Sequence, residues 1–169
     1  MSEATPETIE AMVRRLSAFE DLRQLRGRYW RYVDTKRWSD LGELFIPEAH
    51  FLDHIAEFEC NGRAEIVERF SAALETTVSV HIGQQSELEL LDDTHARGIW
   101  AMQDHVRFPP VSTHPTMAGP VAEMHGYGHY VDSYVRVDGV WKFASIDLYR
   151  LDVATVIRGR TPLIPDFTV

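Results

Sequence analysis

The chain has 169 residues, of which 44% are hydrophobic and 25% charged, and this composition predicts one ordinary globular domain with a sizeable core. The net charge of −9 argues against nucleic acid and anionic membrane surfaces as partners, because neither attracts an acidic protein. The single cysteine, Cys60, leaves no intrachain disulfide, and no segment approaches the roughly 18 apolar residues of a membrane-spanning helix. With a polar N-terminus that lacks a signal-peptide core, these features predict a cytoplasmic protein.

The first half of the chain is typical of helices. Apolar residues recur at spacings of three and four from Leu16 to Val33, which predicts one long amphipathic helix. Pro47 should end a second, short helix, and Asn61-Gly62 should form a turn before a third. The expected elements are helices over residues 7–35, 38–45 and 63–74, and a strand over residues 49–58.

The second half is typical of strands. Asp92-Asp93 and Asp138-Gly139 predict tight hairpin turns between long apolar runs. The expected strands are residues 77–91, 95–108, 123–137 and 140–151. A Pro- and Gly-rich loop over residues 109–120 is long enough to act as a lid or an interface arm. Helices followed by antiparallel strands predict an α+β fold in which three N-terminal helices pack on a strongly curved, mostly antiparallel sheet.

This arrangement should enclose a cone-shaped cavity between helices and sheet, and ligand sites favour such concavities. The domain is expected to span residues 1–152, with residues 153–169 as a C-terminal tail.

The stretch VSVHIGQ contains the strongest candidate for a catalytic base. Val80 and Ile82 share one face of the predicted strand, while Ser79 and His81 share the other. A lone histidine on a face toward water would be unremarkable, but in a pocket it could transfer protons. On the next predicted strand, Asp104 shares a face with apolar residues, where a carboxylate is costly unless it is paired. Asp104 is therefore either a structural buried acid or a pocket carboxylate.

Asp34 ends the first predicted helix, where the partial negative charge of the helix terminus disfavours an acid. It could be a solvated residue, the N-cap of the next helix or a functional carboxylate. Tyr29 lies about one turn earlier and Tyr32 nearby, although aromatic residues at this spacing are more often part of a core.

The sequence contains no motif for a metal site or for a cofactor site. His125 and His129 are four residues apart, which in a strand separates them by about 13 Å, too far for one zinc ion. The chain has no HExxH, GxSxG or CxxC motif and no Gly-rich phosphate loop. The sequence therefore predicts no metal and no cofactor, and leaves histidine, carboxylates and tyrosine as equipment for proton transfer.

Three segments resemble a known family. They are the helix end RYxxYVDTKRWSDLGELF, the strand VSVHIGQ and the ending GHYVDSYVRVDGVWKFASIDLYRLD. Over roughly residues 8–152 the chain resembles the SnoaL-like branch of the superfamily named for nuclear transport factor 2. Within it, the segment YVRVDGVWKFA is especially similar to scytalone dehydratase. The spacing of Tyr29, Asp34, His81 and Asp104 resembles that of bile-acid 7α-dehydratase, and the dehydrochlorinase that acts on hexachlorocyclohexane shares the Asp–His pair. This scaffold hosts enzymes, binding proteins and adaptors alike.

The resemblance implies that Asp34 meets His81 inside the cavity, and that Tyr29 and Asp104 act beside them as further catalytic residues. Arg150 is implied as the pocket arginine. The residues implied to contact substrate are Tyr32, Trp100, Met102, Tyr130 and Arg150. Gly128 and Tyr130 stand where scytalone dehydratase carries polar residues, so the substrate should differ from that of scytalone dehydratase.

The implied function is that of a cofactor-independent lyase, a dehydratase of a cyclic, largely apolar hydroxy-carbonyl compound. An isomerase or a polyketide-type cyclase would use the same proton abstraction. A non-catalytic binding or association module, including one like a ring-dioxygenase small subunit, is the alternative from another class. The outer sheet face, with Arg97, Gln103 and His105 beside several valines, predicts a homo-oligomer. The resemblance to the dehydratases of this group implies a trimer in preference to a dimer.

Overall fold

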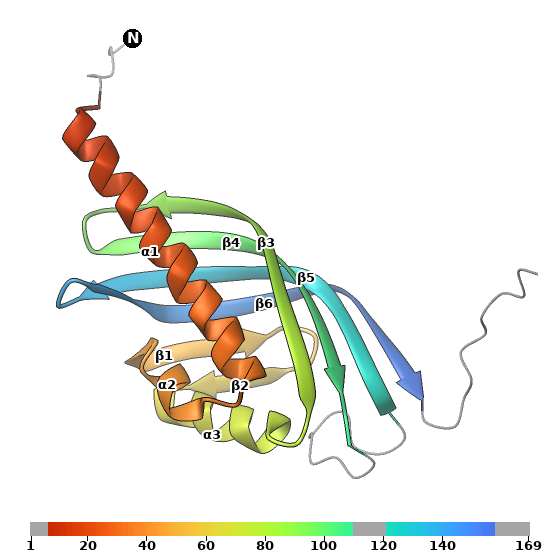
Figure 1. Ribbon diagram of the computed structural model, residues 1–169. Coiled ribbons are helices and arrows are strands. Elements are labelled where there is room, and N and C mark those ends of the chain that lie inside the picture. The colour runs from red at the N-terminus through yellow and green to blue at the C-terminus, as the bar shows by residue number, and fades with distance from the viewer. Residues whose placement is uncertain (1–6, 110–120, 158–169) are drawn as a thin grey trace, which may run out of the picture.

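The computed structural model describes residues 7–109 and 121–157, in which three helices pack on one six-stranded sheet (Figure 1). The helices are α1 (Ile9–Asp34), α2 (Trp38–Gly42) and α3 (Arg63–Leu74). The strands are β1 (Phe45–Asp53), β2 (Phe58–Asn61), β3 (Val78–Leu90), β4 (His95–Arg107), β5 (Val121–Val137) and β6 (Val140–Ile157). The predicted α+β fold is confirmed. Most of the expected lid or arm, residues 110–120, and residues 158–169 of the expected tail lie outside the described residues.

The sheet is mixed, as expected, with the order β2-β1-β6-β5-β4-β3. All neighbouring strands are antiparallel except β1 and β6, which run parallel. The long strands β3 to β6 curve strongly, and α1 crosses their concave side (Figure 1). The edge strands β2 and β3 are not paired with each other, so the described sheet stays open rather than closing into a barrel.

The boundaries differ from the sequence expectation at three places. The second helix ends at Gly42, and the expected strand over residues 49–58 is two antiparallel strands joined by a turn. Pro47 lies inside β1, between Phe45 and His50, where the pairing with β6 shifts register. The missing N–H of proline is tolerated at such an irregularity. At the other end, β6 continues past residue 152 to Ile157, into the segment expected to be a tail.

The core lies between α1 and the concave face of the sheet. Leu22, Leu25, Tyr29 and Val33 form a buried stripe on α1 at spacings of three and four, as the sequence pattern predicts. The Tyr29 ring packs edge-on against Phe143 of β6, with ring centres 5.7 Å apart. This packing fixes the C-terminal end of α1, and with it Asp34, against the sheet.

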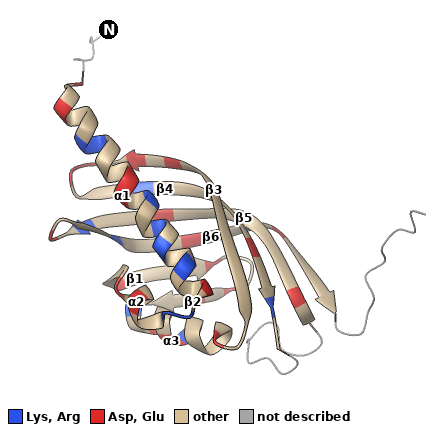
Figure 2. Ribbon diagram, viewed as in Figure 1, with Lys and Arg blue, Asp and Glu red and all other residues tan. Residues whose placement is uncertain are grey.

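Charged residues occur on both the helices and the strands. Figure 2 shows basic residues along α1 and acidic residues over several strands. None of the helices in residues 7–109 and 121–157 has the length and apolar content needed to cross a membrane.

Candidate active site

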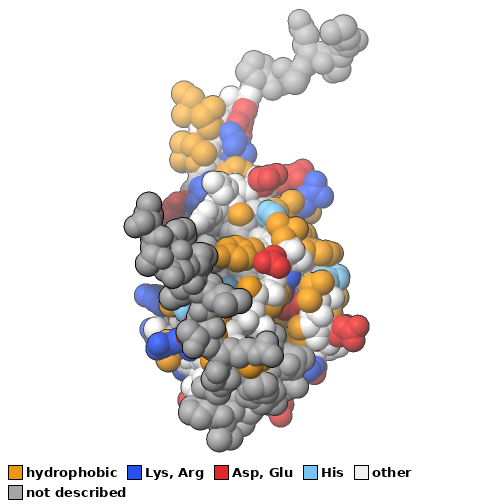
Figure 3. All heavy atoms as spheres, turned by 90° about the vertical axis from the view of Figure 1, so that its right-hand side faces the viewer, with side chains coloured by type: hydrophobic (Ala, Val, Ile, Leu, Met, Phe, Trp, Pro, Cys, Tyr) orange, Lys and Arg blue, Asp and Glu red, His pale blue; other side chains and the backbone are white. Residues whose placement is uncertain are grey.

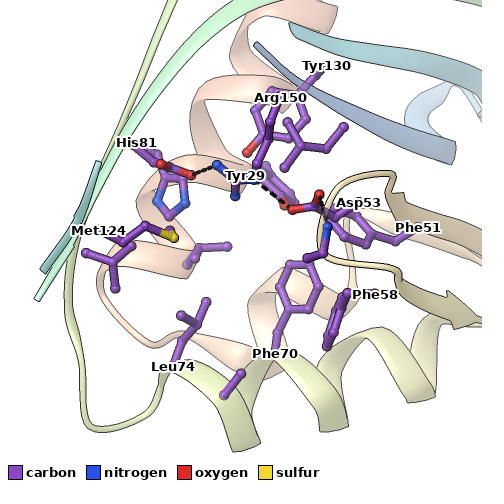
Figure 4. Close-up of a pocket in the computed structure, with 16 residues that line it drawn as sticks. Tyr29, Phe51, Asp53, Phe58, Phe70, Leu74, His81, Met124, Tyr130 and Arg150 are labelled. Carbon is purple, nitrogen blue, oxygen red and sulfur yellow. Dashed lines mark hydrogen bonds and ion pairs between the residues drawn. The ribbon is translucent and has the colours of Figure 1, made fainter. Parts of the chain in front are cut away.

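A cavity lies between the concave face of the sheet and helices α1 and α3 (Figure 4). Its empty space is about 650 Å³, a figure that includes the open mouth. The polar lining residues are Tyr29, Asp53, His81, Asp104, Tyr130 and Arg150. The apolar lining residues are Val33, Phe51, Ala56, Phe58, Phe70, Ala73, Leu74, Val106, Met124 and Leu148.

His81 belongs to the inner face of β3. Its side chain is 10% exposed, whereas the neighbouring Val80 and Ile82 are 50% and 43% exposed on the outer face. Nδ1 of His81 lies 2.7 Å from Oδ1 of Asp34 at the end of α1. Because a carboxylate can only accept at this distance, Nδ1 carries the proton and Nε2 is left as the basic nitrogen. The arrangement is that of a general base oriented by an acid.

Three further groups hold Asp34 in place. The backbone N–H of His81 donates to Oδ2 of Asp34 at 2.9 Å, and the Ser79 hydroxyl donates to Oδ1 at 2.9 Å. Lys36 in turn donates from Nζ to the Ser79 hydroxyl at 3.1 Å. Burial lowers the pKa of Lys36, while the nearby carboxylates of Asp34 and Glu75 oppose that shift. A hydroxyl and a cation thus compensate the desolvation of Asp34 in addition to the imidazole.

A second set of polar side chains is linked across the sheet from β4 to β1. Nη1 of Arg150 on β6 lies 2.9 Å from Oδ2 of Asp104 on β4. Nε of the same arginine donates to Oδ2 of Asp53 on β1 at 2.8 Å. In the strand register, Asp104 lies opposite His81 on one side and Gly126 on the other. The Arg150 side chain crosses β5 at Gly126, where a Cβ atom would collide with its Nη1. Figure 4 shows Arg150 between Asp53 on one side and His81 on the other.

The charges in this group are set by burial and by one another. Burial alone would lower the pKa of Arg150, but Asp104 and Asp53 outweigh it and raise that pKa, so the guanidinium stays charged. Oδ1 of Asp104 is buried and has no hydrogen-bond partner among the described residues. Burial raises the pKa of the Tyr29 and Tyr130 hydroxyls, so both remain O–H donors. The cavity thus offers a base, a cation and two neutral donors.

The structure brings most of the predicted site residues to this cavity. Tyr29, His81, Asp104, Tyr130 and Arg150 line it. Asp34 lies behind His81 and contacts its imidazole, but Asp34 is not itself one of the lining residues.

Three residues expected to bind substrate do not lie among the described lining residues, which corrects that expectation. Trp100 and Met102 point inward from β4 but are buried nearer its N-terminal end, where Trp100 packs edge-on against Trp30 of α1 at 5.8 Å. Tyr32 lies beside the guanidinium groups of Arg31 and Arg37 instead of facing the cavity.

Gly126 is predicted to be essential for the Arg150 bridge. A Cβ atom at this position would collide with Nη1 of Arg150 and Oδ1 of Asp104. Gly126→Ala should therefore displace the ion pair and cost about 1–3 kcal/mol of unfolding free energy, as overpacking of buried sites does. Gly27→Ala is the control, because a Cβ at this exposed helix position meets nothing within 4 Å. Chemical unfolding of both variants is the measurement, and a Gly126→Ala variant as stable as the parent would contradict the prediction.

Comparisons with known proteins agree with this fold. Residues 14–147 match the sequence model of a family described as the SnoaL-like domain. A crystal structure of a protein from Novosphingobium aromaticivorans, provisionally named a scytalone dehydratase, is 18% identical, with a TM-score of 0.72 over 89% of this chain and 99% of that one. A type 2 hexachlorocyclohexane dehydrochlorinase is 17% identical, with a TM-score of 0.72 over 90% and 99% of the two chains.

A third similar structure, also from Novosphingobium aromaticivorans, is provisionally named an aromatic ring hydroxylase. It is 18% identical, with a TM-score of 0.68 over 80% of this chain and 91% of that one. At these identities the three structures show a shared fold.

Proposed function

This chain belongs to the SnoaL-like domain family, and from that premise we propose that it is a cofactor-independent lyase. The observation that carries the proposal is the Asp34–His81 pair, whose Nδ1–Oδ1 distance is 2.7 Å, in one cavity with the buried Arg150–Asp104 ion pair. Two of the proteins with this fold are named a dehydratase and a dehydrochlorinase, and both names describe eliminations. We infer a dehydratase acting on a cyclic, largely apolar hydroxy-carbonyl compound.

In the proposed reaction, Nε2 of His81 removes a proton from the carbon next to the substrate carbonyl. The electrons of that C–H bond form a C=C bond as the C–O bond on the following carbon breaks. The imidazolium gives its proton to the departing hydroxide, which leaves as water, so the products are an unsaturated carbonyl compound and water. Asp34 stabilises the imidazolium while it exists, because its carboxylate accepts the Nδ1 proton.

The other polar groups would bind the substrate oxygens. Arg150, Tyr29 and Tyr130 can donate to the carbonyl oxygen, on which negative charge grows as the proton leaves. Asp104 would act through Arg150, whose Nη1 lies 2.9 Å from its Oδ2. The aromatic rings on the opposite wall, Phe51, Phe58 and Phe70, suit an apolar ring system, which is why we propose a cyclic substrate.

The test uses cyclic 3-hydroxy ketones of one to four rings in heavy water. We expect a rise in the ultraviolet absorbance of the conjugated product, deuterium at the carbon next to the carbonyl in the matching ketones that lack the hydroxyl group, and loss of both in His81→Ala. Exchange without loss of water would favour an isomerase or cyclase. A ketone that binds by calorimetry but neither exchanges nor reacts would refute the lyase and favour a binding module.

We also propose that copies of this chain associate through the outer face of the sheet, as a trimer in preference to a dimer. Hydrophobic side chains lie on the face that Figure 3 turns toward the viewer. On the outer face, Val80, Ile82, Ile99 and Val131 are 50%, 43%, 40% and 37% exposed. Light scattering at micromolar concentration should give three times the chain mass of 19.4 kDa. Ile99→Lys should lower that mass, and a monomeric parent protein would contradict the proposal.

A further inference from the structure

Two histidines and a glutamate meet on the outer face of the sheet. His105 of β4 lies directly opposite His125 of β5, and their rings stack with centres 4.0 Å apart and planes 18° apart. Glu123 precedes His125 by two residues and shares its face, because side chains alternate along a strand. A single oxygen, Oε2 of Glu123, lies 3.1 Å from Nε2 of His105 and 3.6 Å from Nε2 of His125.

We propose that His105, Glu123 and His125 bind a divalent transition-metal ion such as zinc. One ligand atom from each residue lies within 4.8 Å of the others. Zinc holds nitrogen and oxygen ligands at about 2.0–2.2 Å in a tetrahedron, which places neighbouring ligand atoms about 3.4 Å apart. The two histidine-to-glutamate separations, 3.1 and 3.6 Å, lie on either side of this value. The stacked rings would have to turn out of their parallel arrangement so that both Nε2 lone pairs point at the ion, and water would fill the fourth position.

The surroundings of this cluster suit a metal ion. The neighbouring strands place Val80 beside His105 and Ala154 beside His125, so neither flank presents a competing cation. Arg107, opposite Glu123 in the register, is the one basic residue that the paired strands place at the cluster. The three side chains are between 35% and 39% exposed in the single chain, which leaves them accessible to an ion before any association through this face.

The geometry also separates this cluster from three other histidine–carboxylate pairs in the described residues. His50 pairs with Glu59, His54 with Asp147 and His95 with Asp92. Each of those pairs offers a single imidazole, whereas a zinc site requires more ligands than one histidine and one carboxylate. The cluster is also separate from the proposed active site. His105 follows Asp104 in β4, so its side chain points to the opposite face of the sheet from the cavity.

The test is titration of the full-length protein, without a polyhistidine tag and freed of metal by a chelator, with zinc chloride in a calorimeter. We expect one zinc ion per chain. His105→Ala and His125→Ala should each weaken binding about 100-fold or more, since even the loss of a residue outside the ligand set costs about 10–100-fold. Glu123→Gln should also weaken it. His129→Ala is the matched control, because His129 shares the strand and face of His125 but lies outside the cluster.

Circular dichroism of each variant checks that the fold is retained, which we expect because the substituted side chains are partly exposed. No zinc uptake by the parent protein at micromolar concentrations would overturn the proposal. Parent-like binding by His125→Ala would overturn it as well. If His81→Ala rather than His125→Ala abolished binding, the ion would belong to the cavity and the outer site would be refuted.

Discussion

Replacing His81 with alanine is expected to lower the rate of proton abstraction about 10²–10⁴-fold, the usual contribution of a positioned general base. The variant should still fold, because His81 lies at a cavity wall and its removal leaves Asp34 bonded to Ser79 and to the backbone N–H of residue 81. The measurement is deuterium exchange into a bound ketone, which reports proton abstraction whether the overall reaction is an elimination, an isomerisation or a cyclisation.

Asp34→Asn should also slow exchange, for a different reason. An amide can donate to Nδ1 of His81, which would move the ring proton to Nε2 and remove the basic nitrogen from the cavity. Because the two residues act as one unit, the double variant should lose little more than the worse single variant. His50→Ala is the control, since His50 pairs with Glu59 outside the cavity. Full exchange activity in His81→Ala would refute the mechanism.

The sequence alone predicts the fold well because its local signals agree. The stripe from Leu22 to Val33 and the turn Asp138-Gly139, whose φ angles are +50° and +81°, each specify their element without tertiary information. Alternation along β4 likewise predicts the inner face that carries Asp104, and the structure buries that face. The opposite holds for β3, where the valine face is exposed and the Ser79–His81 face is turned inward. From hydrophobicity alone, the valine face of β3 would have been predicted to point inward.

The rest of the site depends on which strands pair, and sequence spacing does not contain that information. Asp53 meets Arg150 only because β1 lies beside β6, although Asp53 shares a strand face with Phe51 and could have been found by the reasoning applied to Asp104. Gly126 is required because the side chains of Arg150 and Asp104, which lie on two other strands, occupy the space where its Cβ atom would be. His105 and His125 are 20 positions apart in the chain and meet through the register of β4 and β5.

The buried pair Arg26–Asp132 is predicted to give the largest stability effects in the described part of the chain. Nη2 of Arg26 lies 2.7 Å from Oδ1 of Asp132, and both side chains are 0% exposed. The guanidinium packs against the Tyr130 ring at 3.9 Å, and Tyr134 donates its hydroxyl to Oδ2 of Asp132 at 2.5 Å. Removing either partner leaves an uncompensated buried charge, so Arg26→Met and Asp132→Asn should each cost about 3–5 kcal/mol.

Urea unfolding followed by tryptophan fluorescence measures these losses, and the double variant Arg26→Met/Asp132→Asn should lose less than the sum of the two. The exposed pair Arg37–Asp40 provides the control, because Arg37→Met should cost less than about 1 kcal/mol. Equal costs at the buried and exposed pairs would contradict the prediction.

The cost of Arg26→Met should also depend on pH. Burial raises the pKa of Asp132 to about 6, although Arg26 and the Tyr134 hydroxyl oppose that shift. In an unfolded chain the pKa of an aspartate is about 3.9, so between these values the folded protein binds the proton more readily, and stability rises as pH falls through that window.

Without Arg26, the folded pKa of Asp132 should rise further, which extends the window upward. The stability deficit of Arg26→Met relative to the parent protein should therefore be largest at pH 8 and shrink toward pH 5, because protonated Asp132 no longer needs a cationic partner. Urea unfolding at both pH values is the measurement, and an unchanged deficit would show that the lost packing of Arg26, rather than the unpaired carboxylate, dominates its cost.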